Sequence, residues 1–426
     1  MSEISEQAQL ARNASFKMAV LSREQKDSAL RAIAESLDKN KALIFEANKK
    51  DVAKATADDL DKPLLKRLGF GEAKLADSVS GILSLITLED PVGRTTLHTS
   101  LDDGLELYRV TCPIGVIGVI FESRPDALIQ IATLCLKSGN SVFLKGGSEA
   151  YNTNLTLAKI IYDAGVGAGL PEGWLHLLTT RSEISEMLGL DEYIDLIIPR
   201  GSNSFVQYIM RNTNIAVLGH ADGVCHTYVH KACDKDKALK VIIDAKTQYV
   251  SVCNATETIL VDEELKDTVL PDIIGALKSA GVEIYGDQYV ADKFGGILQT
   301  EWHHEYLDMK VSVKLVSGIN EAIEHINRYG SGHTDAILTE DQDARDRFMA
   351  EVDSGSVLVN CSTRFADGFR YGFGAEVGIS TSKIHARGPV GLEGLVSYKY
   401  KLYGDGDIVA PYASGDKKFK HIKHDI

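Results

Sequence analysis

The chain has 426 residues, of which 44% are hydrophobic and 25% charged, and its formal net charge at pH 7 is -14. This composition predicts a soluble globular protein with two or three domains, and its acidic balance argues against a nucleic-acid or anionic membrane surface. No long apolar run or secretory signal occurs, so we expect no membrane span. Six sparse cysteines without a Cys-x-x-Cys pair predict a reducing compartment, which we take to be the cytoplasm.

The first part of the chain, residues 5–90, predicts a helical segment. Apolar residues recur there at helical spacing, and charged residues lie between them. Residues 105–110 then alternate apolar and polar side chains, which predicts a half-buried antiparallel strand. Residues 396–402 alternate in the same way, and we expect this strand to pair with 105–110 within the subunit or across a subunit boundary.

Between these segments, short apolar runs alternate with helical patterns. Buried strands are predicted at 114–121, 141–144, 175–178 and 196–198, which indicates a doubly wound parallel sheet. Ligands of such sheets bind beyond the carboxyl ends of the strands, where this chain carries Arg124, Lys145 and the pair Gly201-Ser202. Each glycine-bearing loop taken alone could equally be an ordinary turn, because no dinucleotide or Walker fingerprint is present.

A second α/β unit follows Gly223. Its predicted helices are 237–245, 273–278 and 319–326, and its predicted strands are 259–261 and 311–315. Residues 360–380 are rich in glycine and charge, which is typical of a functional loop. The basic tail 417–424 is predicted to be mobile.

Cys253 lies between an amide-rich approach and the strand 259–261. Two interpretations compete for it. A buried structural cysteine is the commoner case, because free cysteine is among the most buried residue types. A catalytic nucleophile is the alternative, and support for it must come from elsewhere in the chain.

Several motifs along the chain, one of which contains Cys253, supply that support. They are Pro113–Ile117 with Phe121–Pro125, Lys137–Asn140 with Lys145–Gly147, Pro199–Asn203, Asp244–Thr247 with Cys253–Ala255, and the long run Arg364–Leu392. With them the chain resembles the γ-glutamyl phosphate reductase family, the proline-biosynthesis branch of the aldehyde dehydrogenase superfamily. The resemblance covers nearly the whole chain, from about residue 5 to residue 410.

The resemblance implies an aldehyde dehydrogenase-like α/β fold, with two doubly wound α/β domains and a β-hairpin oligomerisation element. The implied division is an NADP-binding domain at 1–93 and 113–225, a catalytic domain at 226–394, an oligomerisation β-element at 94–112 and 395–412, and a mobile tail at 413–426. A homo-oligomer is therefore expected.

The implied reaction is the NADPH-dependent reduction of L-glutamyl 5-phosphate to L-glutamate 5-semialdehyde, with release of phosphate. Cys253 would attack the acyl phosphate and form a thioester, which hydride then reduces. Because an acyl phosphate is labile, we also hypothesise an association with glutamate 5-kinase, which makes this substrate.

The resemblance assigns site residues one by one. The Cys253 N–H and the Ser123-Arg124 loop would stabilise an oxyanion, and Arg124 is a candidate for the leaving phosphate, the alternative being an ordinary salt bridge. His220 could be an acid/base, a substrate contact or a structural histidine. The substrate-binding set is His220, Asn254, Asn360, Ser362 and Arg364. The alternative for Arg364 is that it only pins its own loop to neighbouring acids.

For the cofactor, Lys145 matches the lysine that holds the adenosine ribose, and Ser148 leaves room for a 2′-phosphate, which favours NADP(H). Many relatives carry a lysine at the position of Ser148. Gly201 and Ser202 match the loop under the pyrophosphate, and Glu305 matches a glutamate on the nicotinamide ribose. No Cys/His spacing resembles a zinc site, so no metal is expected.

Three departures and three rival functions complete the predictions. Residues 218–223 lack the glutamate that activates water in hydrolytic aldehyde dehydrogenases, and Val250 and Thr256 replace the usual proline and methionine around Cys253. The rivals are a CoA-acylating or hydrolytic dehydrogenase, a non-catalytic metabolite-binding protein, and a Cys/His hydrolase. The last is disfavoured because nothing in the sequence couples a particular histidine to Cys253.

Overall fold

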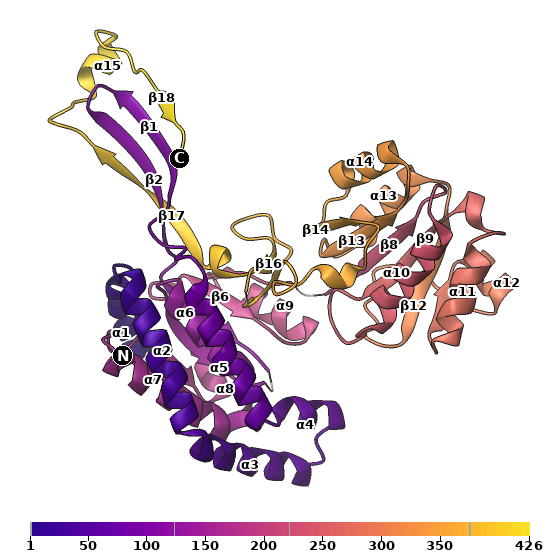
Figure 1. Ribbon diagram of the computed structural model, residues 1–426, viewed down its shortest axis with the longest axis horizontal. Helices are drawn as coiled ribbons and strands as arrows, with labels where there is room; N and C mark the ends of the chain where they lie inside the picture. The colour runs from indigo at the N-terminus through magenta and orange to yellow at the C-terminus, as the bar shows by residue number, and fades with distance from the viewer. Residues whose placement is uncertain (1, 123, 221, 375) are drawn as a thin grey trace.

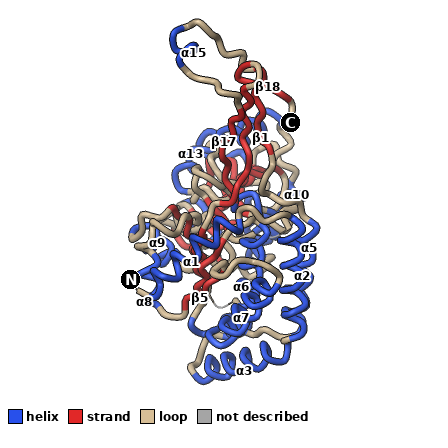
Figure 2. Tube along the Cα trace, turned by 90° about the vertical axis from the view of Figure 1, so that its left-hand side faces the viewer, coloured by secondary structure: helices blue, strands red, loops and turns tan. Residues whose placement is uncertain are grey.

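The structure is a computed structural model, and it describes residues 2–122, 124–220, 222–374 and 376–426. Two α/β lobes lie side by side, and a β-sheet arm extends away from them (Figure 1). Figure 2 shows the same arm from the side, rising beyond the helices of the N-terminal lobe. Among the described helices, none combines the length and the apolar character needed to cross a membrane.

The predicted helical segment forms five helices of the first lobe (Figure 1). Ser22 and Gln25 begin the second of them with a reciprocal capping box, in which each side chain bonds the backbone of the other. Ile33 of the second helix and Ile82 of the fifth belong to the core on one face of the first sheet, whereas Ile4 of the first helix belongs to the core on the other face. The helices are α1 (Glu3–Met18), α2 (Arg23–Lys39), α3 (Lys41–Ala57), α4 (Lys62–Leu68) and α5 (Glu72–Thr87).

The first sheet is parallel throughout, with the strand order β5-β4-β3-β6-β7. Its four main strands are those predicted from the apolar runs, and their residues are mostly buried. Its elements are β3 (Val116–Ile120), α6 (Pro125–Lys137), β4 (Ser141–Lys145), α7 (Tyr151–Gly167), β5 (Leu175–Leu178), α8 (Arg181–Met187), β6 (Leu196–Pro199), α9 (Asn203–Arg211) and β7 (Ala216–Val217).

The second sheet has seven parallel strands in the order β11-β10-β12-β9-β8-β13-β14. Its elements are β8 (Cys225–Val229), α10 (Lys235–Thr247), β9 (Thr256–Asp262), α11 (Leu270–Ser279), β10 (Glu283–Gly286), α12 (Gln288–Phe294), β11 (Ile297–Leu298), β12 (Lys310–Val316), α13 (Ile319–Tyr329), β13 (Thr334–Leu338), α14 (Gln342–Glu351) and β14 (Ser356–Val359). The two parallel sheets together confirm the predicted fold class.

The chain returns from the second lobe to the first through residues 360–395. This segment contains the short hairpin of β15 (Gly378–Ser380) and β16 (Gly388–Val390). Val377, Val390 and Leu392 belong to the hydrophobic core of the first lobe. The domain division predicted from the sequence assigns these three residues to the catalytic domain. In the structure, however, their side chains pack in the core of the first lobe. The division itself stays a prediction.

The arm is an antiparallel sheet in the order β17-β2-β1-β18. Its strands are β1 (Thr95–Asp102), β2 (Leu105–Pro113), β17 (Val396–Tyr403) and β18 (Ile422–His424), and the short helix α15 (Ala410–Ser414) precedes β18. The predicted pairing of 396–402 with 105–110 occurs within one chain, between β17 and β2. The end of the tail that the sequence predicts to be mobile from residue 413 forms β18, which pairs with β1. The mobility of this tail stays a prediction.

Candidate active site

Cys253 lies in the turn that joins α10 to β9, at the amino edge of the second sheet. A buried ion pair fixes both flanks of this turn, since Lys246 Nζ in α10 lies 2.6 Å from Glu257 Oε2 in β9. Burial lowers the pKa of Lys246 and raises that of Glu257 to about 7, and their mutual attraction opposes both shifts. Glu257 also accepts a hydrogen bond from the backbone N–H of Leu307.

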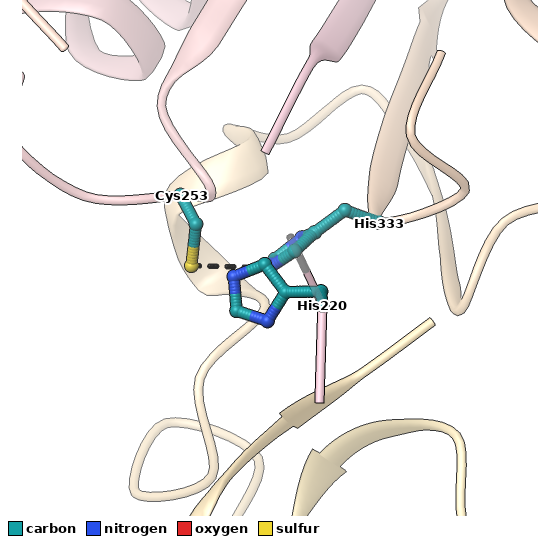
Figure 3. Close-up of side chains that lie close together, drawn as sticks. All are labelled: His220, Cys253 and His333. Atoms are coloured by element: carbon teal, nitrogen blue, oxygen red, sulfur yellow. Dashed lines mark hydrogen bonds between the residues drawn. The ribbon is translucent and has the colours of Figure 1, made fainter. Parts of the chain in front are cut away.

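The thiol of Cys253 faces two histidines (Figure 3). His333 Nε2 lies 3.1 Å from Cys253 Sγ, and His333 Nδ1 lies 2.8 Å from the hydroxyl of Thr334. The ring of His220 packs edge-on against that of His333, with centroids 4.9 Å apart. A specific histidine therefore lies beside Cys253, a pairing that nothing in the sequence indicated.

The protonation state of this pair follows from its burial. Burial raises the pKa of Cys253 to about 12, with further increases from the charges of Glu305 and Glu376, while Arg200 opposes them. Burial also holds the pKa of His333 well below its usual value. The ligand-free site therefore holds a neutral thiol beside a neutral imidazole, whose Nε2 can accept the thiol proton.

Gly223 lets the chain pass directly behind Cys253. A Cβ on Gly223 would lie 2.1 Å from the carbonyl oxygen of Cys253 and 2.5 Å from its Cα. Only glycine permits this approach without moving the turn. The Gly223 N–H donates a 2.9 Å hydrogen bond to Glu305 Oε1. A second oxygen of Glu305 accepts from Asn203 Nδ2 at the start of α9, at 3.2 Å, so this predicted cofactor residue connects the two lobes.

The loop after β14 surrounds the turn of Cys253 on its other side. Arg364 donates from Nε to Gln248 Oε1 at 3.0 Å, and its carbonyl accepts from Arg370, which lies 3.6 Å from Asp367. Asn254 donates to the Ala366 carbonyl, while its buried Oδ1 has no hydrogen-bond partner among the described residues. Arg364 thus contacts the chain before the turn, and Asn254, which lies in the turn, retains one acceptor for a ligand.

The other two residues predicted for the substrate are engaged in holding this loop. Asn360 uses both atoms of its side-chain amide on the backbone of Thr339, and Ser362 Oγ accepts from the Arg364 N–H. His220 donates from Nδ1 to the Ile379 carbonyl at 3.0 Å. A substrate role for Asn360 and Ser362 stays a prediction.

Arg124 lies at the start of α6, where Nη2 is 3.1 Å from Asp126 Oδ2. The salt bridge weighed against a phosphate role is thus present in the ligand-free protein. The charge of Arg124 also acts on the half-buried Arg200. The pKa of Arg200 is lowered by burial and by this neighbour, while Glu376 opposes the shift. Ser123 lies outside the described residues. Arg124 and Arg200 therefore join Arg364 among the guanidinium groups around the site, and a site role for Arg200 was not predicted.

Except for Glu305, the predicted cofactor residues lie at the carboxyl edge of the first sheet. A cleft of about 710 Å³ is lined there by Lys145, Ser148, Glu149, Arg200 and Ser202 together with residues of α8 and α9. Gly201 packs beside Glu122 and Phe205. This is the edge at which open α/β sheets bind nucleotides. The carboxylate of Glu149 lines the same cleft beside Ser148.

Two functional side chains, His333 and Arg200, were missed from the sequence. The region before β13, Gly330-Ser331-Gly332-His333, offered one signal, because a glycine-bearing turn leads directly into the buried apolar strand 334–338. Arg200 adjoins the glycine loop already chosen, at the end of a buried strand. Both residues thus lie at the end of a strand: His333 directly before β13 and Arg200 directly after β6.

Together, a nucleotide-sized cleft on one sheet and a cysteine–histidine pair on the next define an oxidoreductase of the aldehyde dehydrogenase class. A sequence model described as the aldehyde dehydrogenase family matches residues 1–291. Proteins named gamma-glutamyl phosphate reductase from Acetivibrio thermocellus and Pelotomaculum thermopropionicum are 58% and 59% identical to the chain, over 99% of it and 98% of each relative. The chain belongs to the aldehyde dehydrogenase family and, within it, to the γ-glutamyl phosphate reductases.

Solved structures support the same assignment. The crystal structure of gamma-glutamyl phosphate reductase from Thermotoga maritima has a TM-score of 0.93 and 39% identity, and the match covers 96% of this chain and 100% of that one. An acetylating aldehyde dehydrogenase from Geobacillus thermoglucosidasius, at 17% identity and a TM-score of 0.64 over 95% of this chain and 97% of its own, shares the fold alone. Membership of the family implies a nicotinamide cofactor.

Proposed function

We propose that the protein reduces L-glutamyl 5-phosphate to L-glutamate 5-semialdehyde with NADPH, releasing phosphate, as a step of proline biosynthesis. The observation that carries this proposal is the 3.1 Å contact between Cys253 Sγ and His333 Nε2, with the charge of Arg200 acting on the sulfur. It supplies a nucleophile, a proton acceptor and a cation in one place. The names of the relatives supply the substrate class.

The first half of the reaction forms a thioester. His333 Nε2 accepts the thiol proton, and the sulfur of Cys253 forms a bond to the γ-carbonyl carbon while the bond from that carbon to the phosphate oxygen breaks. The departing phosphate is dianionic or nearly so. We assign its binding to Arg200, whose charge acts on the sulfur, and to Arg124, whose charge acts on Arg200. The backbone N–H of Cys253 is a donor for the carbonyl oxygen.

The second half releases the aldehyde. When held in the cleft lined by Lys145 and Ser202, a nicotinamide cofactor would be the source of the hydride that reduces the thioester carbon. The resulting thiohemiacetal then collapses, as its carbon–sulfur bond breaks and the sulfur is protonated again, with His333 as the proton donor. Asn254 Oδ1, which is buried without a partner among the described residues, and Arg364 are the groups that suit the ammonium and the carboxylate of the glutamyl head.

The preference for NADPH is supported by Ser148, which leaves space where a carboxylate would repel a 2′-phosphate. Lys145, whose Nζ donates to the Gly146 carbonyl at 2.5 Å, lies in the same cleft. Glu149 also lines that cleft, so the two positions need separate tests. We expect Ser148→Glu to lower kcat/KM for NADPH and to spare NADH. If Ser148→Glu leaves the preference for NADPH over NADH unchanged and Glu149→Gln alters it, the choice of cofactor depends on Glu149.

The reaction class is tested in the reverse direction. We expect glutamate semialdehyde, supplied as pyrroline-5-carboxylate, to reduce NADP+ beyond one equivalent per subunit only when phosphate is present, because phosphate is the acceptor of the thioester. Coenzyme A in place of phosphate tests the acylating rival, and buffer alone tests the hydrolytic rival. The hydrolytic arm is needed because a glutamate near the thioester can activate water. Residues 218–223 contain no glutamate, but the charges of Glu305 and Glu376 act on the sulfur. Turnover in either arm without phosphate would reject the proposal.

We also propose a cytoplasmic homo-oligomer assembled through the arm. The outer strand β17 exposes large apolar side chains to solvent, among them Tyr400 and Leu402, which a second copy of the arm would cover. Sedimentation of the full chain should show more than one subunit, and Tyr400→Lys with Leu402→Lys should yield monomers.

An association with glutamate 5-kinase is proposed from the lability of the substrate. Equal flux at high and low kinase concentration, without co-purification, would argue against it.

A further inference from the structure

Three side chains with metal-binding atoms converge at the mouth of the active site. His220, Cys253 and His333 each offer one ligand atom, and these atoms lie within 4.8 Å of one another (Figure 3). Two imidazoles and one thiolate form a ligand set that zinc prefers, with bonds of about 2.0–2.3 Å and a tetrahedral arrangement. Ligand atoms in such a site lie roughly 3.5 Å apart, so shifts of about 1 Å would close this one.

The orientation of His220 is the one that a metal-binding histidine requires. Its Nδ1 lies 3.0 Å from the carbonyl oxygen of Ile379, and a carbonyl can only accept a hydrogen bond, so the proton of the neutral ring is on Nδ1. The lone pair is then on Nε2, and Figure 3 shows the second ring nitrogen turned towards the sulfur of Cys253. A backbone carbonyl behind the ring is the usual outer support of a zinc-binding histidine.

His333 is held in a comparable way on the opposite side of the sulfur. Its Nδ1 lies 2.8 Å from the Thr334 hydroxyl, while its Nε2 already lies 3.1 Å from Cys253 Sγ. His333 is buried, whereas Cys253 and His220 are partly exposed, so a hydrated ion can reach the group from the side of His220. The fourth position of the metal faces that side and can keep a water molecule.

We propose that His220, Cys253 and His333 form a reversible Zn²⁺ site whose occupation blocks the nucleophile. On binding, the sulfur–zinc bond forms and the thiol proton is released to solvent, with no change of oxidation state. The sulfur lone pair that would attack a carbonyl is then bound to the metal, and His333 can no longer accept a proton. The site does not depend on the identity of the substrate, because its three ligands belong to the protein.

The binding test uses Co²⁺ as a spectroscopic probe on the full-length protein. A second group, His98, Glu106 and His424 on the arm, also has ligand atoms within 4.8 Å, so the titration is done with His424→Ala as the background. We expect one equivalent of Co²⁺ to give a thiolate-to-cobalt charge-transfer band, and Zn²⁺ to displace it. Cys253→Ser should abolish the band. The matched control is Cys225→Ser, whose thiol lies 3.8 Å from His333 Nδ1 but outside the cluster, and it should retain the band.

Loss of either histidine should weaken the site. His220→Asn and His333→Asn should each reduce zinc affinity by at least the ~10–100-fold that removal of an outer-shell partner costs. Because a variant could fail to fold, unmodified protein provides a second test: Zn²⁺ should protect Cys253 from alkylation, and a chelator should restore the reaction. A Co²⁺ complex without the charge-transfer band, or alkylation of Cys253 at the same rate with and without Zn²⁺, would overturn the proposal.

Discussion

His333 Nε2 lies 3.1 Å from Cys253 Sγ although 80 residues separate them in the chain. The two residues meet because each precedes a strand of the same parallel sheet, Cys253 before β9 and His333 before β13, with β8 between these strands. The nucleophile thus lies at the amino edge of the second sheet, whereas the cofactor cleft lies at the carboxyl edge of the first. The active site is formed where these two edges face each other.

Replacing His333 tests whether it moves the thiol proton. We expect His333→Gln to lower kcat/KM by about 10²–10⁴-fold, the range for a positioned acid or base, and to flatten the pH profile. The control is His303→Gln, an exposed histidine that bonds Asp222 and the Tyr329 carbonyl. A His333→Gln enzyme with the activity and pH profile of its parent would show that the 3.1 Å contact is only structural.

The pH dependence of Cys253 alkylation tests the electrostatics of the site. With a pKa of about 12, the thiolate is scarce at neutral pH, so the alkylation rate of the ligand-free protein should rise about tenfold per pH unit up to that pKa. Glu305→Gln keeps the acceptor for Gly223 and removes a negative charge, so it should lower the pKa and speed alkylation. Arg200→Gln removes a positive charge and should slow it.

The control for this charge series is Glu301→Gln, an exposed residue of the same segment that is not among the groups acting on the sulfur. Rates are compared at one pH, with alkylation at Cys253 located by peptide mass. Equal rates in Glu305→Gln and Arg200→Gln would mean that burial alone sets the pKa.

Gly223 and Gly219 provide a matched pair of substitutions. A Cβ on Gly223 would lie 2.1 Å from the Cys253 carbonyl oxygen, whereas on Gly219 it would meet only ordinary contacts with Pro199, at 3.5 Å and beyond. We expect Gly223→Ala to displace the turn and reduce kcat by about 100-fold, the cost of a misplacement near 1 Å, while Gly219→Ala retains activity. Steady-state kinetics on both, with circular dichroism to confirm folding, decides. Equal activities would contradict the proposed seating of Cys253.

The ion pair of Lys246 and Glu257 is predicted to position the turn rather than to add net stability. Both side chains are fully buried, so Lys246→Met alone leaves Glu257 without a partner and should cost about 3–5 kcal/mol in the free energy of unfolding. The double variant Lys246→Met with Glu257→Leu should recover most of that loss yet remain a poor enzyme, because the flanks of Cys253 are no longer fixed. Urea unfolding and kcat of the double variant check both halves.

Full activity in the double variant would show that the pair has no positioning role. A Lys246→Met variant as stable as the parent would mean that the carboxyl of Glu257 is neutral in it. The pKa of about 7 for Glu257 makes protonation accessible near neutral pH. Unfolding is therefore measured at pH 8 as well as at pH 6, where the protonated carboxyl should reduce the loss.

Much of the fold followed from local sequence patterns. The buried strands of the first sheet were predictable because a strand covered by helices on both faces is apolar along its length, as in β3 and β4. Strands β8 and β13 were not predicted. Their buried polar residues, among them His226 and Asp335, which pair at 3.0 Å, interrupt the apolar pattern.

The candidate site was predictable only in part, for a related reason. Cys253 and Lys145 stand in recognisable motifs, but the partner of Cys253 is chosen by the strand order β9-β8-β13, which local patterns do not encode. Asn360 shows the converse. Its place in the glycine-rich loop suggested a ligand contact, yet its amide holds the backbone of Thr339 on both sides. Spatial pairing, rather than residue type, separates these cases.

The central claim, a thioester on Cys253, is tested most directly in a single turnover without phosphate. The protein is mixed with glutamate semialdehyde and NADP+ in phosphate-free buffer, and both the NADPH formed and the mass of the Cys253 peptide are measured. We predict one NADPH per subunit, a glutamyl group on Cys253, and release of that group when phosphate is added. No burst and no adduct, or an adduct that persists in Cys253→Ser, would contradict the account.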